Sequence, residues 1–103
     1  MLNVFVVNDQ VTPMAFVVSV LQEVFGHSEE NGKRTALLAH LNGETICGVC
    51  RNRVEARALV SKAVALSRQR GYPLDFSLSP VPVWWRVGAW LFHMVMKLAP
   101  AQA

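Results

Sequence analysis

Charged residues make up only 17% of the 103 residues, and no strong excess of one sign is present. Ten Lys and Arg against seven Asp and Glu give a net charge of +3 that is spread along the chain. The longest basic runs, Lys33-Arg34 and residues 68–70, have no aromatic pair beside them on which nucleic-acid bases could stack. The sequence therefore indicates no nucleic-acid partner.

Motifs for catalysis are also missing. The chain shows no Ser-His-Asp arrangement, no paired carboxylates and no glycine-rich phosphate loop at a suitable spacing. We therefore expect neither an enzyme nor a cofactor. The start of the chain, Met1-Leu2-Asn3-Val4, has no basic leader and no cleavage pattern, which indicates a cytoplasmic location rather than secretion.

Cysteine is scarce, with two residues in the C-x-x-C pattern Cys47-Gly48-Val49-Cys50. Two cysteines do not make a disulfide framework, and no second pair completes a zinc site. On a regular strand, residues three apart point to opposite faces and lie about 10 Å from one another, too far for a disulfide bond. We expect buried structural cysteines.

The apolar patterns predict one α+β domain of six elements in the order strand, helix, helix, strand, helix, strand. The three strands are expected at residues 2–7, 45–49 and 74–78. Thr12 suits the N-cap of the first helix and Pro13 its first position, with Gly26 at its end. The helical spacing of its apolar residues makes this the clearest helix: Phe16, Val17, Val20, Leu21 and Val24.

The second helix is expected to begin after a Ser28 N-cap, with Glu29 and Glu30 in its first turn, and to stop at Asn42-Gly43. Its apolar residues Leu37, Leu38 and Leu41 are expected to face inward. The third helix is expected to begin after Asn52, with Glu55 completing an arrangement like a capping box, and to end near Gly71.

Composition changes after the stiff Pro80-Val81-Pro82 segment, which divides an expected domain at residues 1–79 from a tail at 80–103. Residues 83–98 predict a hydrophobic helix whose polar side chains, Arg86, His93 and Lys97, share one face. A membrane span needs about 20 apolar residues, so this shorter segment favours either a membrane surface or docking on protein. The protein surface would be the domain's own sheet or a second copy.

Residues 7–17, VNDQVTPMAFV, resemble the signature of the ClpS family, in which a strand ends in Asn-Asp and Thr-Pro-Met opens the first helix. Further short matches follow in order at nearly unbroken spacing, so the resemblance covers residues 2–78: Leu37-Leu38-Ala39-His40 with Gly43, Ile46-Cys47-Gly48-Val49, and Tyr72-Pro73-Leu74. The resemblance implies a three-stranded antiparallel sheet with helices packed on it.

The resemblance also implies a function, namely an adaptor that needs no cofactor. Such an adaptor binds proteins whose first residue is Leu, Phe, Tyr or Trp and passes them to a Clp unfoldase of the ClpA or ClpC kind. By position, Asn8, Asp9 and His40 would hold the ligand's α-amino group. A second set would line the side-chain pocket: Thr12, Met14, Val17, Ala36, Ala39 and Leu74.

Several positions depart from the family pattern. Gln10 replaces a usual Asp, which should weaken the negative potential, while Ala36 and Ala39 replace larger residues, which should favour aromatic ligands. The family usually carries a segment before the first strand, whereas here that strand is expected to begin at Leu2, and the start of the third helix is altered around Arg53 and Ala58. The alternatives are an interaction module that lost or changed delivery, tethered through its tail, and a competitor that binds the unfoldase without delivering cargo.

Overall fold

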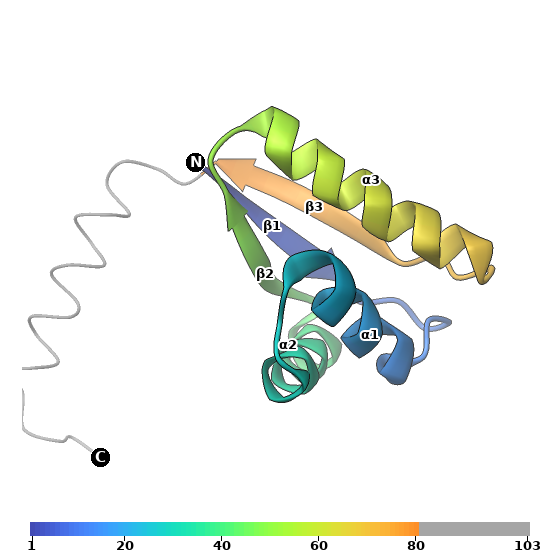
Figure 1. Cartoon of the computed structure of the whole chain (residues 1–103). Helices are drawn as coiled ribbons and strands as arrows, with labels where there is room; N and C mark the ends of the chain where they lie inside the picture. The colour runs from blue at the N-terminus through green and yellow to red at the C-terminus, as the bar shows by residue number, and fades with distance from the viewer. Residues whose placement is uncertain (81–103) are drawn as a thin grey trace, which may run out of the picture.

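The computed structural model describes residues 1–80, which form an α+β domain of three strands and three helices (Figure 1). The predicted order of elements is confirmed. The predicted helix over residues 83–98 lies outside the described residues. The elements along the chain are β1 (Leu2–Val7), α1 (Met14–Phe25), α2 (Glu29–Asn42), β2 (Glu44–Cys50), α3 (Arg53–Gln69) and β3 (Asp75–Pro80).

The sheet is antiparallel with the strand order β2-β1-β3, so the first strand of the chain lies at the centre. Side chains alternate across β1. Leu2, Val4 and Val6 are buried against the helices, whereas Asn3, Phe5 and Val7 are only partly covered. At one end of the sheet Leu2 lies opposite both Cys50 and Pro80, and Figure 1 shows the tip of β3 beside the amino terminus.

The start of α1 differs from the prediction. Thr12 is not the N-cap, because the helix begins at Met14 and Pro13 occupies the N-cap position with an extended backbone. The Pro13 carbonyl accepts hydrogen bonds from the amides of Phe16 and Val17. The hydroxyl of Thr12 is used elsewhere, in the loop that precedes the helix.

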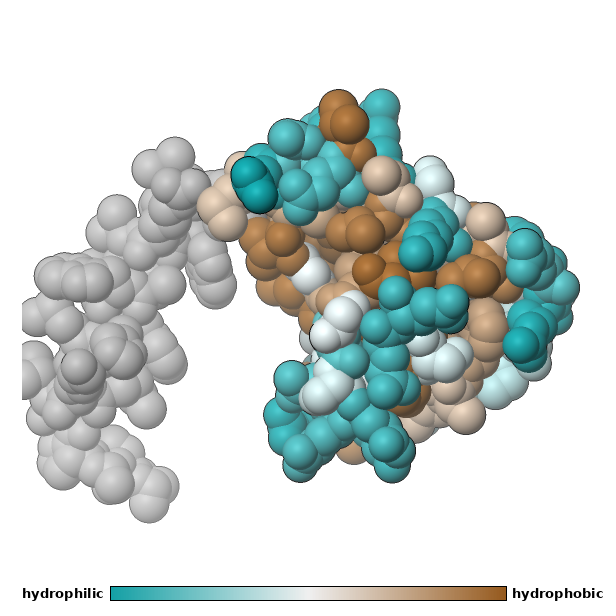
Figure 2. Space-filling view, in the orientation of Figure 1, coloured by the Kyte–Doolittle hydropathy of each residue, from teal (hydrophilic) through white to brown (hydrophobic). Residues whose placement is uncertain are grey.

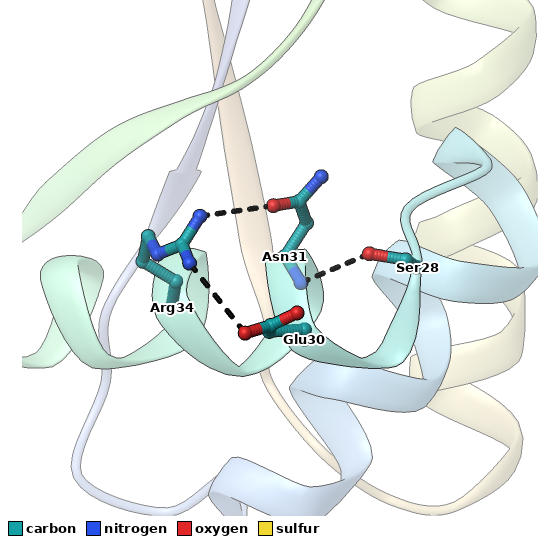
Figure 3. Close-up of polar contacts among 4 residues, drawn as sticks. All are labelled: Ser28, Glu30, Asn31 and Arg34. Atoms are coloured by element: carbon teal, nitrogen blue, oxygen red, sulfur yellow. Dashed lines mark hydrogen bonds and ion pairs between the residues drawn. The ribbon is translucent and has the colours of Figure 1, made fainter.

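The predicted caps of the other two helices are confirmed. The Ser28 hydroxyl accepts a hydrogen bond from the Asn31 amide at 3.1 Å, and Figure 3 shows this cap with the exposed Arg34, whose guanidinium contacts the Asn31 side chain and the Glu30 carboxylate. The Asn52 side chain likewise accepts from the Glu55 amide at 2.9 Å. Gly43 ends α2 with a φ of 90°, a conformation that favours glycine.

The buried side of α2 was predicted wrongly. Leu37, Leu38 and Leu41 are 47%, 40% and 67% exposed, and the buried residues of this helix are instead Gly32, Ala36 and Ala39. A Cβ at Gly32 would lie only 3.2 Å from a methyl group of Val18, so α2 packs closely on α1 through its small residues. The small residues allow α2 to lie close to α1, and this packing leaves the three leucines on the outer side of the helix.

Small residues also bring α3 onto the sheet, because Ala56, Ala63 and Ser67 are each 0% exposed. Ser67 satisfies its hydroxyl by donating to the carbonyl of Ala63 at 2.8 Å. Figure 2 shows apolar surface gathered between α3 and the pair α1 and α2, with hydrophilic surface on the outer sides of these helices. The largest fully buried apolar side chains of the core are Leu21, Leu74, Val4, Val6, Val20 and Cys50.

Cys47 and Cys50 do not point to opposite faces, because β2 is irregular. The register against β1 shifts between Val4, which lies opposite Gly48, and Phe5, which lies opposite Ile46. Cys47 is therefore the extra residue of a bulge, and both cysteines are buried and free. The interpretation as buried structural cysteines is in agreement with this burial.

Both thiols are expected to resist alkylation in the folded chain. Burial raises the pKa of Cys47 to about 12 and also raises the pKa of Cys50, so at neutral pH neither forms the reactive thiolate. Iodoacetamide followed by mass spectrometry should leave the native chain unmodified while the same chain in guanidinium gains two adducts. Rapid labelling of the native chain would contradict the burial of these thiols.

Candidate functional site

A cavity of about 210 Å³ lies where the carboxyl end of β1 meets α1, α2 and the residue before β3. All nine predicted site residues line it: Asn8, Asp9, Thr12, Met14, Val17, Ala36, Ala39, His40 and Leu74. Val6, Val7 and Gln10 line it as well and were not among the predicted residues. They lie within two residues of Asn8 and Asp9 in the sequence, and this proximity is the signal that could have indicated them.

Asp9 organises the loop between β1 and α1. One carboxylate oxygen accepts hydrogen bonds from the amides of Val11 at 2.8 Å and Thr12 at 2.6 Å, and the other accepts from the Thr12 hydroxyl at 2.8 Å. Burial alone raises the pKa of Asp9, but the hydrogen bonds from Thr12 and Val11 and the positive charge of Arg68 outweigh it, so the pKa lies below the usual value. The carboxylate is therefore ionised at neutral pH.

The three bonds within the loop leave Asp9 little spare hydrogen-bonding capacity. A carboxylate can accept about four hydrogen bonds, so one acceptor position remains for a ligand. Asp9 thus has two effects on the cavity. It holds the loop in place through these hydrogen bonds. It also gives the cavity a negative charge, whose attraction for a cation does not require a direct hydrogen bond.

Asn8 and His40 reach the cavity from different elements that a backbone bond joins. The amide of Asn8 donates to the carbonyl of Gly43 at 2.8 Å, which ties the end of β1 to the end of α2. His40 lies in the last turn of α2 and is exposed to solvent. This bond therefore places a solvent-accessible imidazole at the same cavity as the Asn8 side chain.

The walls of the cavity are apolar and come from three directions. Val17, Ala36, Ala39 and Leu74 are all at most 9% exposed, whereas Met14 is 42% exposed. The four buried residues therefore form the apolar interior of the cavity, and the more exposed Met14 lies at its opening. The cavity is therefore apolar inside and polar at the Asn8, Asp9 and His40 side.

Leu74 is held by its backbone as well as by packing. The guanidinium of Arg68, at the end of α3, donates to the carbonyls of Tyr72 at 2.8 Å and Leu74 at 3.0 Å. The positive charge of this same Arg68 lowers the pKa of Asp9. The end of α3 thus supports both the apolar wall and the acidic loop.

A sequence model of the family described as ATP-dependent Clp protease adaptor protein ClpS matches residues 1–77. The chain belongs to the ClpS family. ClpS relatives are similar over most of their own length: the ClpS adapter protein of Nitrosospira multiformis is 42% identical over 73% of this chain and 72% of the relative, and ClpS 2 of Rhizobium meliloti is 41% identical over 76% of each.

The fold predicted for this chain is confirmed by its similarity to a solved structure. ClpS2 of Agrobacterium tumefaciens, bound to L-phenylalaninamide, is similar with a TM-score of 0.74 and 36% identity, over 78% of this chain and 95% of that chain. The ligand of that protein has a free amino group and an aromatic side chain. An adaptor of the ClpS kind is not itself a protease.

Two features are absent from residues 1–80. No group of three or more His, Cys, Asp and Glu side chains in this range could hold a metal ion. Within the same residues, no helix has the length and apolar character that crossing a membrane requires. The cavity beside Asp9 combines an ionised carboxylate with an apolar interior and is the candidate site.

Proposed function

We propose that this chain is an adaptor that binds proteins through a bulky hydrophobic first residue with a free amino group and delivers them to a Clp unfoldase for degradation. One observation carries the proposal. An ionised Asp9, with Asn8 and His40 beside it, lies at an apolar cavity whose walls include Ala39 and Leu74. The family of the chain supports the same conclusion.

The two parts of the cavity match the two parts of such an amino terminus. An α-ammonium group has three donors and a positive charge, and the cavity offers it the Asp9 carboxylate together with the side chains of Asn8 and His40. The apolar walls receive the first side chain. Burial of a large apolar side chain is worth about 1.5–3 kcal/mol and each charge-assisted hydrogen bond about 1.5–3 kcal/mol, which together indicate roughly micromolar affinity.

Acetylation of the peptide amino group is expected to abolish binding. The acetylated nitrogen has no charge and a single N–H, so it cannot satisfy the acceptors around Asp9. Calorimetry with a peptide that begins with free Phe and its acetylated counterpart tests this, and a peptide that begins with free Ser is the control for the side-chain cavity. Equal affinities of the free and acetylated peptides would refute amino-group recognition.

Delivery is a separate part of the proposal, with a ClpA- or ClpC-like unfoldase as the partner and the cytoplasm as the location. A reporter that begins with Phe should be degraded faster by such a Clp protease when the chain is added. Binding of the peptide without faster degradation would favour the alternatives, an interaction module or a competitor at the unfoldase. Attachment through residues 83–98 to a membrane surface or to a second copy is a further alternative.

A further inference from the structure

The sheet has a second face that no helix of residues 1–80 covers. We call it the open face. Residues opposite one another in antiparallel strands share a face, so Phe5 brings Ile46 and Ser77 to its own side, and Asn3 brings Val49 and Ser79. All of these lie opposite to the core side of β1, which holds Leu2, Val4 and Val6.

Apart from Asn3 and Glu44, the open face is apolar over β1 and β2. Ile46 is 43% exposed and Val49 is 51% exposed, and the partly covered Phe5 and Val7 lie next to them on the central strand. Over β3 the same face carries the small side chains of Ser77 and Ser79, which leave room above the strand, and Asp75 at its Val7 end. An uncovered apolar sheet surface of this kind usually packs against another element.

One end of the open face is acidic. Glu44 and Asp75 both lie opposite Val7, one on each side of β1. The carboxylate of Glu44 reaches across β1 to accept a hydrogen bond from the Ser77 hydroxyl at 3.4 Å, which confirms that the two edge strands share this face. The apolar part of the open face is therefore followed by two carboxylates at the Val7 end of the sheet.

The chain continues from the opposite end. Pro80 is the last residue of β3 and lies opposite Leu2, so residues 81–103 begin at the edge of the open face, far from Glu44 and Asp75. Their sequence contains all three tryptophans of the protein, Trp84, Trp85 and Trp90, and its few basic groups include Lys97.

We propose that residues 83–98 dock on the open face of the sheet and complete the core of the domain from that side. As a helix, as the pattern predicts, 16 residues are about 24 Å long, and a six-residue strand is about 20 Å long. A helix that starts after Pro82 at the Leu2 end therefore reaches the Val7 end with its last turn. Lys97 then lies near the carboxylates of Glu44 and Asp75.

Length, apolar character and charge favour the chain's own sheet over the other two partners. The tail is covalently attached at the edge of the face, so docking is intramolecular and has a high effective concentration. A second copy would lose this advantage. The acidic Val7 end would repel a negatively charged membrane surface. The same acidic end would attract the basic side chains of the tail.

Tryptophan fluorescence of the full chain tests the proposal, since every tryptophan lies in residues 83–98. In buffer without lipid, we expect a blue-shifted emission maximum and weak quenching by acrylamide, both unchanged on dilution. Val49→Lys should shift the emission to the red and increase the quenching severalfold. Val54→Lys is the matched control, because Val54 is 80% exposed at the start of α3 and lies outside the open face.

Folding is checked by circular dichroism of both variants, and Ile46→Lys repeats the test at a second position of the open face if Val49→Lys unfolds the domain. Solvent-exposed emission of the wild-type chain in buffer would overturn the proposal, including the case in which anionic vesicles then shift it to the blue. Quenching that grows on dilution would assign the tail to a second copy instead. Protected emission that persists in Val49→Lys and Ile46→Lys would overturn docking on this face.

Discussion

Asp9→Asn is expected to weaken binding of a peptide that begins with free Phe by roughly ten- to a hundredfold, while the domain stays folded. The asparagine oxygen can still accept from the amides of Val11 and Thr12, so the loop keeps its main bonds. The negative charge and the remaining acceptor position are lost. A charge-assisted hydrogen bond is worth about 1.5–3 kcal/mol, which sets the expected loss.

Fluorescence anisotropy of the labelled peptide measures this change. Glu55→Gln removes the same charge in the first turn of α3, at the other end of the sheet, and should leave the affinity unchanged. Asp9→Ala should be worse than Asp9→Asn, because it also removes the acceptors of the Thr12 amide and hydroxyl. If Asp9→Asn bound as tightly as wild type, the charge would have no part in recognition.

Ala39→Met is expected to lower the affinity for peptides that begin with Phe or Trp by roughly ten- to a hundredfold. Ala39 is 3% exposed and lines the cavity of about 210 Å³, so a longer side chain there occupies the space that an aromatic ring needs. Overpacking a filled site costs about 1–3 kcal/mol. A peptide that begins with Leu should lose less, because its side chain is smaller.

The wild-type chain is expected to prefer aromatic first residues over Leu, since Ala36 and Ala39 leave space in the walls and a larger ring buries more apolar area. Anisotropy with peptides that begin with Trp, Phe and Leu gives the ranking for wild type and variant. Ala65→Met adds the same side chain on the exposed side of α3 and is the matched control. Tightest binding of Leu to the wild-type chain would contradict the size argument.

The departures from the family pattern lie in two places, in the cavity and at the start of α3. Gln10 lines the cavity but brings no charge. Among residues 1–80, Asp9 is therefore the only residue with a carboxylate that lines the cavity. The altered positions around Arg53 and Ala58 lie on α3, outside the cavity. Peptide binding and accelerated degradation can therefore fail independently, and measuring both distinguishes an adaptor from a module that retained only the fold.

Local sequence determined the parts of this protein that depend on neighbouring residues. Ser28 and Asn52 cap their helices as predicted, because a side-chain oxygen bonds an amide three residues ahead. Gly43 ends α2 because it adopts a positive φ that other residues avoid. The order of strands and helices follows from such signals and from apolar spacing, and it was confirmed in full.

Only the tertiary structure decided which of several compatible local arrangements was used. The leucines of α2 do not face inward as predicted, because Gly32, Ala36 and Ala39 allow this helix to approach α1 more closely. Thr12 could have capped α1, but the Asp9 carboxylate bonds both its amide and its hydroxyl.

The sheet and the site needed the folded chain for the same reason. A bulge against β1 placed both cysteines in the core, and this register depends on pairing with a distant strand. The cavity itself joins the loop after β1, the last turn of α2 and Leu74, which are far apart in sequence. Residue types and motifs indicated what chemistry these positions could perform, but packing and long-range hydrogen bonds brought them together.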